Sequence, residues 1–167
     1  MKKTVYLSLG SNLGDRQANL TSAIERLRDL GEVVAVSSFY ETEPVEFQEQ
    51  PWFLNCAVAL GTDLMPKQLL SRMLAIEQQM GRRRTRPKGP RMIDIDILLF
   101  GNFIVSSREL DVPHPAMHQR RFVLEPLAEI APEVRHPVLK RTVRELMQGL
   151  CNADGKVLKL ARVEHPE

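Results

Sequence analysis

Hydrophobic residues recur with two different spacings along this chain of 167 residues. Alternating or continuous apolar runs of about four to eight residues predict β-strands, whereas apolar positions three and four residues apart predict helices. Strands are therefore expected at residues 4–9, 33–40, 53–60, 93–100 and 103–105, with a further edge strand at 157–163. Helices are expected at residues 16–30, 66–81, about 118–130 and 142–150.

Residues that cap, start or break elements support several of these boundaries. Gly31 is expected to end the first helix in a left-handed conformation, and Pro66 suits the first turn of the second. The pair Thr142 and Glu145 has the spacing of a capping box. The run from Val112 through Pro113 and His114 to Pro115 is expected to be extended. Loops are expected at residues 10–15, 41–51 and 81–91.

The order of the early elements indicates the fold class. It is strand, helix, strand, strand, helix, strand, which is the split βαβ order of ferredoxin-like folds. We therefore expect an α+β fold, a ferredoxin-like α/β sandwich with a mainly antiparallel sheet, in a single domain over residues 1–167. The fold class alone does not give a function.

Composition excludes several classes of protein. With 43% hydrophobic and 26% charged residues the chain is typical of a globular protein, and a net charge of +2 does not indicate nucleic-acid binding. Two cysteines cannot form a disulfide framework, and Cys56 lies in an apolar run and is expected to be buried. The N-terminus lacks the pattern of a signal peptide, and no apolar run approaches the ~18 residues of a membrane span. A cytoplasmic location is expected.

Two carboxylates on an otherwise apolar predicted strand are the first candidate chemistry. Asp94 and Asp96 share one face of that strand, because side chains alternate and these two are about 6–7 Å apart. Two such charges repel each other unless a cation lies between them. Magnesium suits this pair, since it takes one or two carboxylates and leaves positions for phosphate oxygens. A solvated acidic face on an edge strand would show the same pattern.

A cationic run immediately precedes this strand. It contains six basic residues and no acidic one, namely Arg82, Arg83, Arg84, Arg86, Lys88 and Arg91. Arginine suits phosphate oxygens, although a solvated loop or an RNA-contacting loop would also fit. Joined to the carboxylate pair, the run indicates a site for a polyphosphate with Mg²⁺. His114, Arg120 and Arg121 could add phosphate contacts.

An aromatic and an amide side chain on one predicted strand could form an acceptor pocket. Phe53 and Asn55 share a strand face, and together an aromatic face and an amide can hold a flat heteroaromatic ring. Core packing is the competing interpretation for Phe53 and for Phe122.

These motifs together resemble those of one family. The chain is similar to 6-hydroxymethyl-7,8-dihydropterin pyrophosphokinase, an enzyme of folate synthesis, over roughly residues 4–135. The matching segments, in order, are Ser8-Leu9-Gly10-Ser11-Asn12-Leu13-Gly14-Asp15, Ser37-Ser38-Phe39-Tyr40-Glu41-Thr42-Glu43-Pro44, Phe53-Leu54-Asn55, Ile76-Glu77, Gly81-Arg82, Gly89-Pro90-Arg91-Met92-Ile93-Asp94-Ile95-Asp96 and Val112-Pro113-His114-Pro115.

The resemblance implies transfer of the β,γ-diphosphate of ATP to the hydroxymethyl group of the pterin, with release of AMP. It implies that Asp94 and Asp96 hold two Mg²⁺ ions and that Arg82 and Arg91 neutralise the transferring diphosphate, so that these four residues are catalytic. The implied ATP-binding residues are Leu70, Glu77, Arg82, Arg84, Arg91, Ile97, His114 and Arg120, and the implied pterin-binding residues are Thr42, Val45, Phe53, Asn55, Asp94 and Phe122. A monomer that needs neither nucleic acid nor membrane is expected.

Two other classes share part of this pattern. A ferredoxin-like RNA-binding module could use the arginine loop, but aromatic residues are only 5% of the chain and Asp94 and Asp96 would then face phosphates of like charge. A nucleotidyltransferase could use the same paired carboxylates. It would release pyrophosphate, whereas a pyrophosphokinase releases AMP.

Overall fold

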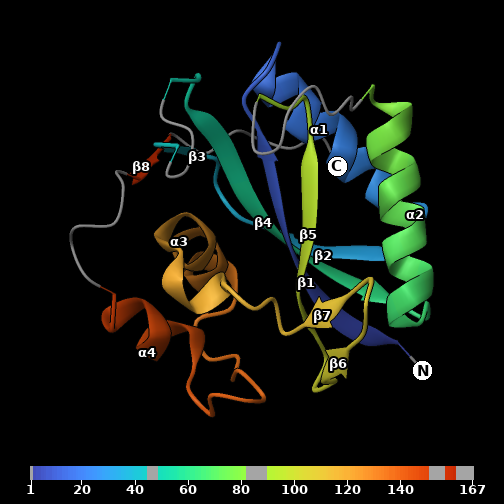
Figure 1. The fold of residues 1–167 in the computed structure, drawn as a ribbon, viewed down its shortest axis with the longest axis vertical. Coiled ribbons are helices and arrows are strands. Elements are labelled where there is room, and N and C mark those ends of the chain that lie inside the picture. The colour runs from blue at the N-terminus through green and yellow to red at the C-terminus, as the bar shows by residue number, and fades with distance from the viewer. Residues whose placement is uncertain (1, 45–48, 82–89, 151–156, 161–167) are drawn as a thin grey trace.

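The computed structural model describes residues 2–44, 49–81, 90–150 and 157–160. The chain runs through strand β1, helix α1, strands β2, β3 and β4, helix α2, strands β5, β6 and β7, helices α3 and α4, and strand β8 (Figure 1). Their bounds are β1 Lys3–Ser11, α1 Arg16–Leu27, β2 Glu32–Val36, β3 Tyr40–Thr42, β4 Phe53–Thr62, α2 Pro66–Gln79, β5 Asp94–Phe100, β6 Val105–Ser106, β7 Asp111–Val112, a 3₁₀ turn Met117–Gln119, α3 Arg121–Ile130, α4 Val143–Gln148 and β8 Val157–Lys159.

The main sheet has the strand order β5-β1-β4-β3-β8, and β2 also pairs with β4. Each of these pairings is antiparallel. The order β5-β1-β4-β2 is that of a split βαβ unit. In this order β1 lies between β5, the last strand of the unit, and β4, which pairs with β2. The predicted α+β class and the mainly antiparallel sheet are confirmed.

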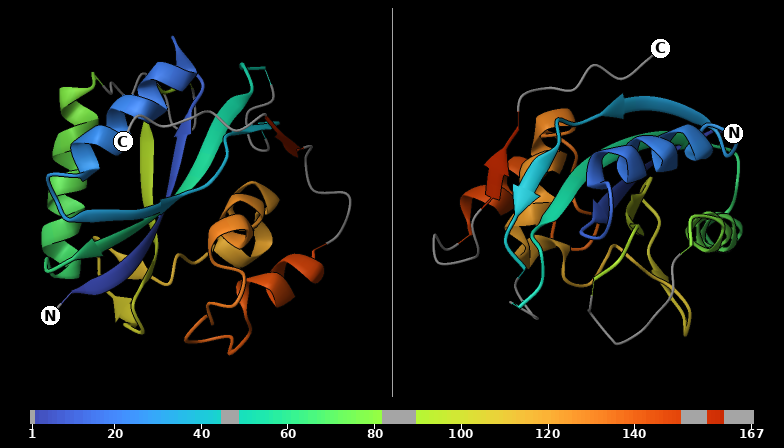
Figure 2. Two further views of the ribbon diagram at one scale, coloured as in Figure 1. Left: turned by 180° about the vertical axis from the view of Figure 1, so that it is seen from behind. Right: turned by 90° about the horizontal axis from the view of Figure 1, so that it is seen from above.

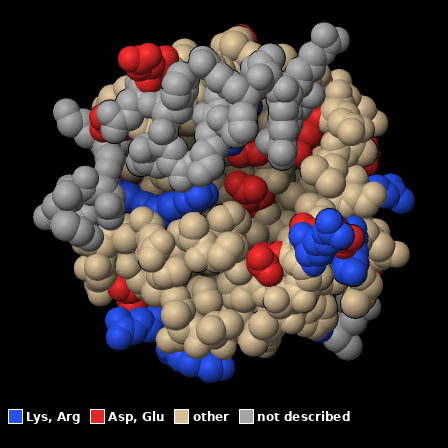
Figure 3. All heavy atoms as spheres, viewed as in Figure 1, with Lys and Arg blue, Asp and Glu red and all other residues tan. Residues whose placement is uncertain are grey.

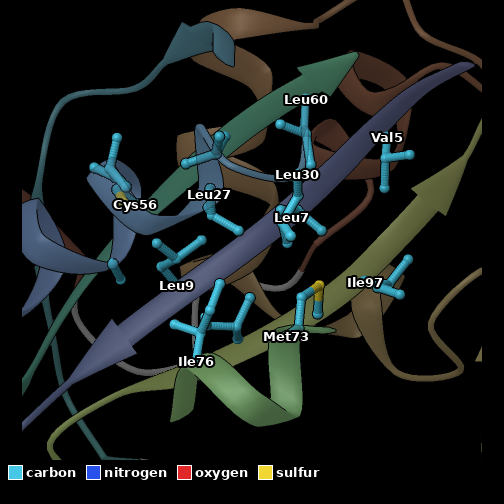
Figure 4. Close-up of a cluster of buried hydrophobic side chains, with 14 of the residues drawn as sticks. Val5, Leu7, Leu9, Leu27, Leu30, Cys56, Leu60, Met73, Ile76 and Ile97 are labelled. Carbon is cyan, nitrogen blue, oxygen red and sulfur yellow. The ribbon is translucent and has the colours of Figure 1, made fainter. Parts of the chain in front are cut away.

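Helices cover both faces of the sheet, with α1 and α2 on one face and α3 and α4 on the other (Figure 2). Between the sheet and the first pair, alternate residues of β1 pack with apolar side chains of α1 and α2 to form the larger core. Figure 4 shows Leu7 and Leu9 of β1 in this core beside Leu27 of α1 and Met73 of α2. Cys56 is also buried there, as predicted, and its burial raises the pKa of its thiol.

The second core lies under α3 and α4. It joins Leu98 and Leu99 of β5 to Leu124 and Leu127 of α3. The helix α4 begins at the predicted capping box, since the Thr142 hydroxyl accepts a hydrogen bond from the backbone N–H of Glu145 and the Glu145 carboxylate accepts one from the backbone N–H of Thr142. The predicted C-terminal strand is confirmed for Val157–Lys159, which pairs with β3 at the sheet edge, and residues 161–163 lie outside the described part.

The strand predicted at residues 33–40 is instead two strands, β2 and β3. Between them, Ser37 uses its hydroxyl to accept the backbone N–H of Ala57, and the N–H of Ser38 donates to the carboxylate of Glu129 on α3. The Tyr40 hydroxyl donates to the same carboxylate at 3.0 Å. The prediction of one continuous strand failed here because Ser38 bonds to Glu129 of α3 instead of to a neighbouring strand. A contact with so distant a residue has no local sequence signal.

Gly31 does not adopt the predicted left-handed cap, since the glycines with positive φ in the described part are Gly14, Gly81 and Gly101. Its role is a close approach of two backbones. A Cβ at Gly31 would lie 2.1 Å from the carbonyl oxygen of Gly61 in β4. Other boundaries shift by a few residues: β1 extends to Ser11, α3 begins at Arg121 after the 3₁₀ turn, and β6 begins at Val105.

Candidate active site

One row of directly opposed residues crosses four strands on the face that α3 partly covers. Asp94 of β5 lies opposite Gly10 of β1, Gly10 lies opposite Asn55 of β4, and Asn55 lies opposite Tyr40 of β3. Opposed residues share a face, and their sequence neighbours point into the larger core on the other side. Asp96, two residues further along β5, lies opposite Ser8 on the same face. The sheet therefore places the carboxylate pair and the amide in one site.

Gly10, at the centre of this row, makes room for the side chain of Asn55. A Cβ there would lie 2.5 Å from Oδ1 of Asn55 and 3.6 Å from a ring carbon of Phe53. The Asn55 side chain thus lies over Gly10 toward Asp94, and it is only 4% exposed. Its Nδ2 donates to the hydroxyl of Thr42 at 2.5 Å, which orients the amide.

Arg91 links the two ends of the site. Its Nη1 donates to Oδ2 of Asp94 at 2.8 Å, with both side chains about one-fifth exposed at 22% and 21%. Its guanidinium carbon lies 5.9 Å from the centroid of the Phe53 ring, within the range of a cation–π contact. Figure 3 shows acidic side chains near the middle of this face and basic side chains on either side of them.

His114 and Arg120 lie in the segment that connects β7 to α3. The backbone N–H of His114 donates to the carbonyl of Leu98 at 2.9 Å, and its Nδ1 accepts the N–H of Ala116 at 3.1 Å. Burial and the nearby Arg120 guanidinium lower the pKa of His114 below its usual 6.5, although the Asp94 carboxylate opposes this shift. The imidazole is therefore mostly neutral at pH 7. Arg120 also lies 5.6 Å from the centroid of the Phe122 ring.

Three of the predicted ATP-binding residues lie on the α2 side of β5. Glu77 is 3% exposed, and its Oε2 accepts the backbone N–H of Ile95 at 2.9 Å. Leu70 and Ile97 pack into the larger core. Strand β5 lies at one edge of the sheet. Glu77, Leu70 and Ile97 are thus on one face of β5, and the other described ATP-binding candidates are on the opposite face. A ligand that crosses the outer edge of β5 could contact both groups.

Three predicted site residues, Val45, Arg82 and Arg84, lie outside the described residues. Sequence reasoning gave no role to Gly10 or Asn12, although both belong to the quoted Gly10-Ser11-Asn12 segment. The sequence signal that could have drawn attention to both residues was a glycine two residues before an asparagine at the end of a predicted strand.

The carboxylates of the described residues bear on a possible metal site. Within residues 2–44, 49–81, 90–150 and 157–160, no group of three or more His, Cys, Asp or Glu side chains could hold a metal ion. The pair Asp94 and Asp96 still fits Mg²⁺, because this ion commonly takes one or two carboxylates and completes its shell with waters and substrate phosphates.

The fold and site define an α+β protein in which paired carboxylates and an arginine adjoin an aromatic ring and a buried amide. The chain belongs to the 7,8-dihydro-6-hydroxymethylpterin-pyrophosphokinase family, whose sequence model matches residues 6–132. That range contains every candidate site residue.

Similar proteins include two named 2-amino-4-hydroxy-6-hydroxymethyldihydropteridine pyrophosphokinase. The one from Methylorubrum extorquens is 47% identical over 147 residues, covering 87% of this chain and 92% of the relative. The one from Aquifex aeolicus is 41% identical over 142 residues, covering 85% and 89%. The Folic acid synthesis protein FOL1 of Dictyostelium discoideum is 43% identical over 148 residues, and the match covers 89% of this chain and 22% of that protein.

A solved structure shares the fold. Wild-type Plasmodium falciparum HPPK-DHPS with pterin and p-hydroxybenzoate matches with a TM-score of 0.72 at 20% identity, over 89% of this chain and 42% of that chain. This chain therefore spans less than half of the Plasmodium chain. In the described residues, no helix is long and apolar enough to cross a membrane.

Proposed function

We propose that this chain transfers the β,γ-diphosphate of ATP to the hydroxymethyl group of 6-hydroxymethyl-7,8-dihydropterin, giving AMP and the pterin diphosphate in folate biosynthesis. The observation that carries the proposal is the contact chain from Asp94 through Arg91 to Phe53. It joins a charged end suited to phosphates to a flat end suited to a pterin ring. Membership of the family supports both ends.

Asp94 and Asp96 are the residues that would hold magnesium, and we propose two ions there. Bound Mg²⁺ supplies neutralisation of the charge on the phosphate oxygens. The chain's own part is to hold two carboxylates on one face of a strand whose alternate residues, Ile95 and Ile97, are anchored in the core. Anchoring on a strand fixes the separation of the two carboxylates.

The pterin binds between the rings of Phe53 and Phe122 of α3, with Asn55 and Thr42 at the edge of its ring. Val45 is a further proposed contact residue. Asn55 can offer both a donor and an acceptor to the ring edge, and the hydroxyl of Thr42 fixes which way its amide points. Since Gly10 carries no side chain, the Asn55 amide can lie over the sheet on the side of Asp94 and face the ring from there. The hydroxymethyl group is then directed toward Asp94.

ATP lies across the outer edge of β5. Its phosphates are bound from the α3 side by Arg91, His114 and Arg120 and by Arg82 and Arg84. Its adenosine lies on the α2 side near Leu70 and Glu77. Ile97 contributes its backbone there, because its side chain is buried. The backbone N–H of Ile95, two residues earlier on the strand, points outward to Glu77, so the backbone of Ile97 faces the same edge.

Charge neutralisation and positioning account for the chemistry. The attacking group is a primary alcohol, and phosphoryl transfer needs little covalent help from the protein. Arg91 can follow the developing charge on the transferring diphosphate because it already lies between the carboxylate and the aromatic end. The protein acts as a monomer, without nucleic acid or membrane.

The product tests this function directly. ATP, Mg²⁺ and 6-hydroxymethyl-7,8-dihydropterin are incubated with the protein, with and without EDTA, and the nucleotide product is identified. AMP that forms only with metal and pterin present is the expected result. Pyrophosphate release would indicate a nucleotidyltransferase instead, and no turnover by the folded protein would refute the proposal.

Two substitutions test the metal assignment. Asp94→Ala and Asp96→Ala should each lower AMP formation by several orders of magnitude while leaving the melting temperature close to that of the parent. Asp29→Asn is the matched control, since Asp29 is exposed in the turn after α1. Near-normal turnover by either aspartate variant at saturating Mg²⁺ would show that the carboxylates do not hold the metal.

A further inference from the structure

Asn12 joins two chain segments that lie on either side of the site. It follows β1 directly and is only 2% exposed. Its backbone N–H donates to the carbonyl of Arg91 at 3.0 Å, and its Oδ1 accepts the N–H of Arg91 at 2.8 Å. Its Nδ2 donates to Oε1 of Gln50 at 2.8 Å and to the carbonyl of Pro51 at 3.1 Å.

The chemistry of this contact set requires a side-chain amide. One end must accept a backbone N–H and the other must donate twice, which a carboxylate or a hydroxyl cannot do together. The two segments held are those that lead into the site. Gln50 and Pro51 run into Phe53 at the start of β4, and Arg91 runs into Asp94 at the start of β5.

The contacts of the Arg91 side chain are too weak to fix its position alone. A part-exposed ion pair contributes little stability, and the 5.9 Å contact with Phe53 lies at the outer limit of cation–π attraction. A backbone shift of about 1 Å at Arg91 would lose that contact. The two hydrogen bonds between the buried Asn12 and the backbone of Arg91 provide the missing constraint.

We propose that Asn12 is a positioning residue that holds the backbone of Arg91 in register with the segment before Phe53, so that the guanidinium stays over the pterin pocket and against Asp94. This inference rests on the proposed function. Asn12 does not touch either substrate; it acts through Arg91. Its loss should therefore have the kinetic signature of losing the correctly placed guanidinium.

Arg16 provides a matched comparison. Its Nη1 donates to the carbonyl of Trp52 at 3.0 Å and to the carboxylate of Glu41 at 2.9 Å. It therefore holds the same segment before Phe53 from the start of α1, but through contacts to Trp52 and Glu41 rather than to Arg91. A general loosening of that segment would appear in Arg16 and Asn12 variants alike.

The test is a double-mutant cycle on kcat for AMP formation. Asn12→Ala is expected to lower kcat by about 10- to 100-fold, the order associated with a misplacement of about 1 Å. Asn12→Ala combined with Arg91→Ala should be no slower than Arg91→Ala alone, within about twofold. Arg16→Met combined with Arg91→Ala should show the product of the two single effects.

The inference would be overturned if the double variant Asn12→Ala with Arg91→Ala lost kcat by the product of the two single losses. It would also be overturned if Arg91→Ala alone kept the full kcat. If Asn12→Ala does not fold, Asn12→Asp gives a separate test, because a carboxylate oxygen can still accept the N–H of Arg91 while the donors to Gln50 and Pro51 are lost. This variant should keep most of kcat and raise the KM for the pterin. A loss of kcat in Asn12→Asp as large as that in Arg91→Ala would overturn the inference.

Hydrogen exchange gives a readout that does not depend on activity. The amide of Arg91 should exchange at least about tenfold faster in Asn12→Ala and stay protected in Arg16→Met, since only the first removes its acceptor. Unchanged exchange at Arg91 would overturn the inference whatever the kinetics. Parent protein that forms no AMP would refute the proposed function instead, and the exchange at Arg91 alone would then decide the inference.

Discussion

Gly10 offers the sharpest test of the pterin pocket, because adding one methyl group there perturbs one defined contact. In Gly10→Ala the new Cβ would stand 2.5 Å from Oδ1 of Asn55, and real Cβ atoms essentially never approach closer than 3.0 Å. Gly10 lies within the nine-residue strand β1, so its backbone cannot yield easily. The Asn55 amide must therefore rotate away from Thr42.

The size of the effect follows from the hydrogen bonds that a rotated Asn55 no longer offers to the edge of the bound pterin. A buried polar group left without its partner costs about 1–3 kcal/mol, and Asn55 is 4% exposed. Because about 1.4 kcal/mol corresponds to a tenfold change in an equilibrium constant, affinity for the pterin should fall about 5- to 150-fold. Affinity for ATP should change by less than about twofold, since Asn55 lies at the pterin end.

Steady-state kinetics with each substrate varied in turn measures both values. Gly61→Ala is the matched control, because a Cβ at this position of β4 would meet only Val34 Cγ2 at 3.7 Å and a backbone oxygen at 3.8 Å, both ordinary contacts. It should keep the parent KM for the pterin. A folded Gly10→Ala protein with an unchanged pterin KM would refute the placement of Asn55 at the pterin edge.

Two further predictions concern stability. Glu77→Leu removes the acceptor of the buried Ile95 N–H and should lower the free energy of unfolding, measured by urea titration, by about 1–3 kcal/mol. The control is Glu25→Gln, which removes an exposed ion pair with Arg28 and should lower the free energy of unfolding by less than about 1 kcal/mol. Burial and the charge of His118 lower the pKa of His136 below 6.5, and its Nδ1 accepts two backbone N–H groups. The unfolded chain therefore binds the proton more tightly, so stability is full above about pH 6.5 and falls as the pH drops through the lower folded pKa. His136→Asn should reduce this decline without abolishing it, because His114 is shifted in the same direction; an unchanged pH dependence would contradict the assignment.

Local signals in the sequence predicted the elements whose residues face one core. Helical spacing located α1 and α2, and alternation placed Asp94 and Asp96 on one face of β5, as the burial of Ile95 and Ile97 between and after them confirms. The capping box at Thr142 predicted the start of α4. In each case the determining contacts lie within a few residues along the chain.

Contacts between distant segments were not predictable in this way. The break between β2 and β3 depends on Glu129, about 90 residues further along the chain. The role of Gly31 depends on the backbone of Gly61, and that of Asn12 on Gln50 and Arg91. The family resemblance named Asn55 and Phe53 as neighbours of the substrate, but only the strand register showed that Gly10 lies between Asn55 and Asp94.

The position of β5 at the sheet edge has a consequence for solubility. An exposed edge strand offers unpaired N–H and C=O groups to which a second chain could add as a further strand. Here the outward N–H of Ile95 is occupied by the buried carboxylate of Glu77. Charged side chains at Asp94 and Asp96 would also be brought against any added strand. The acidic residues of this edge thus protect the folded protein from edge-to-edge aggregation.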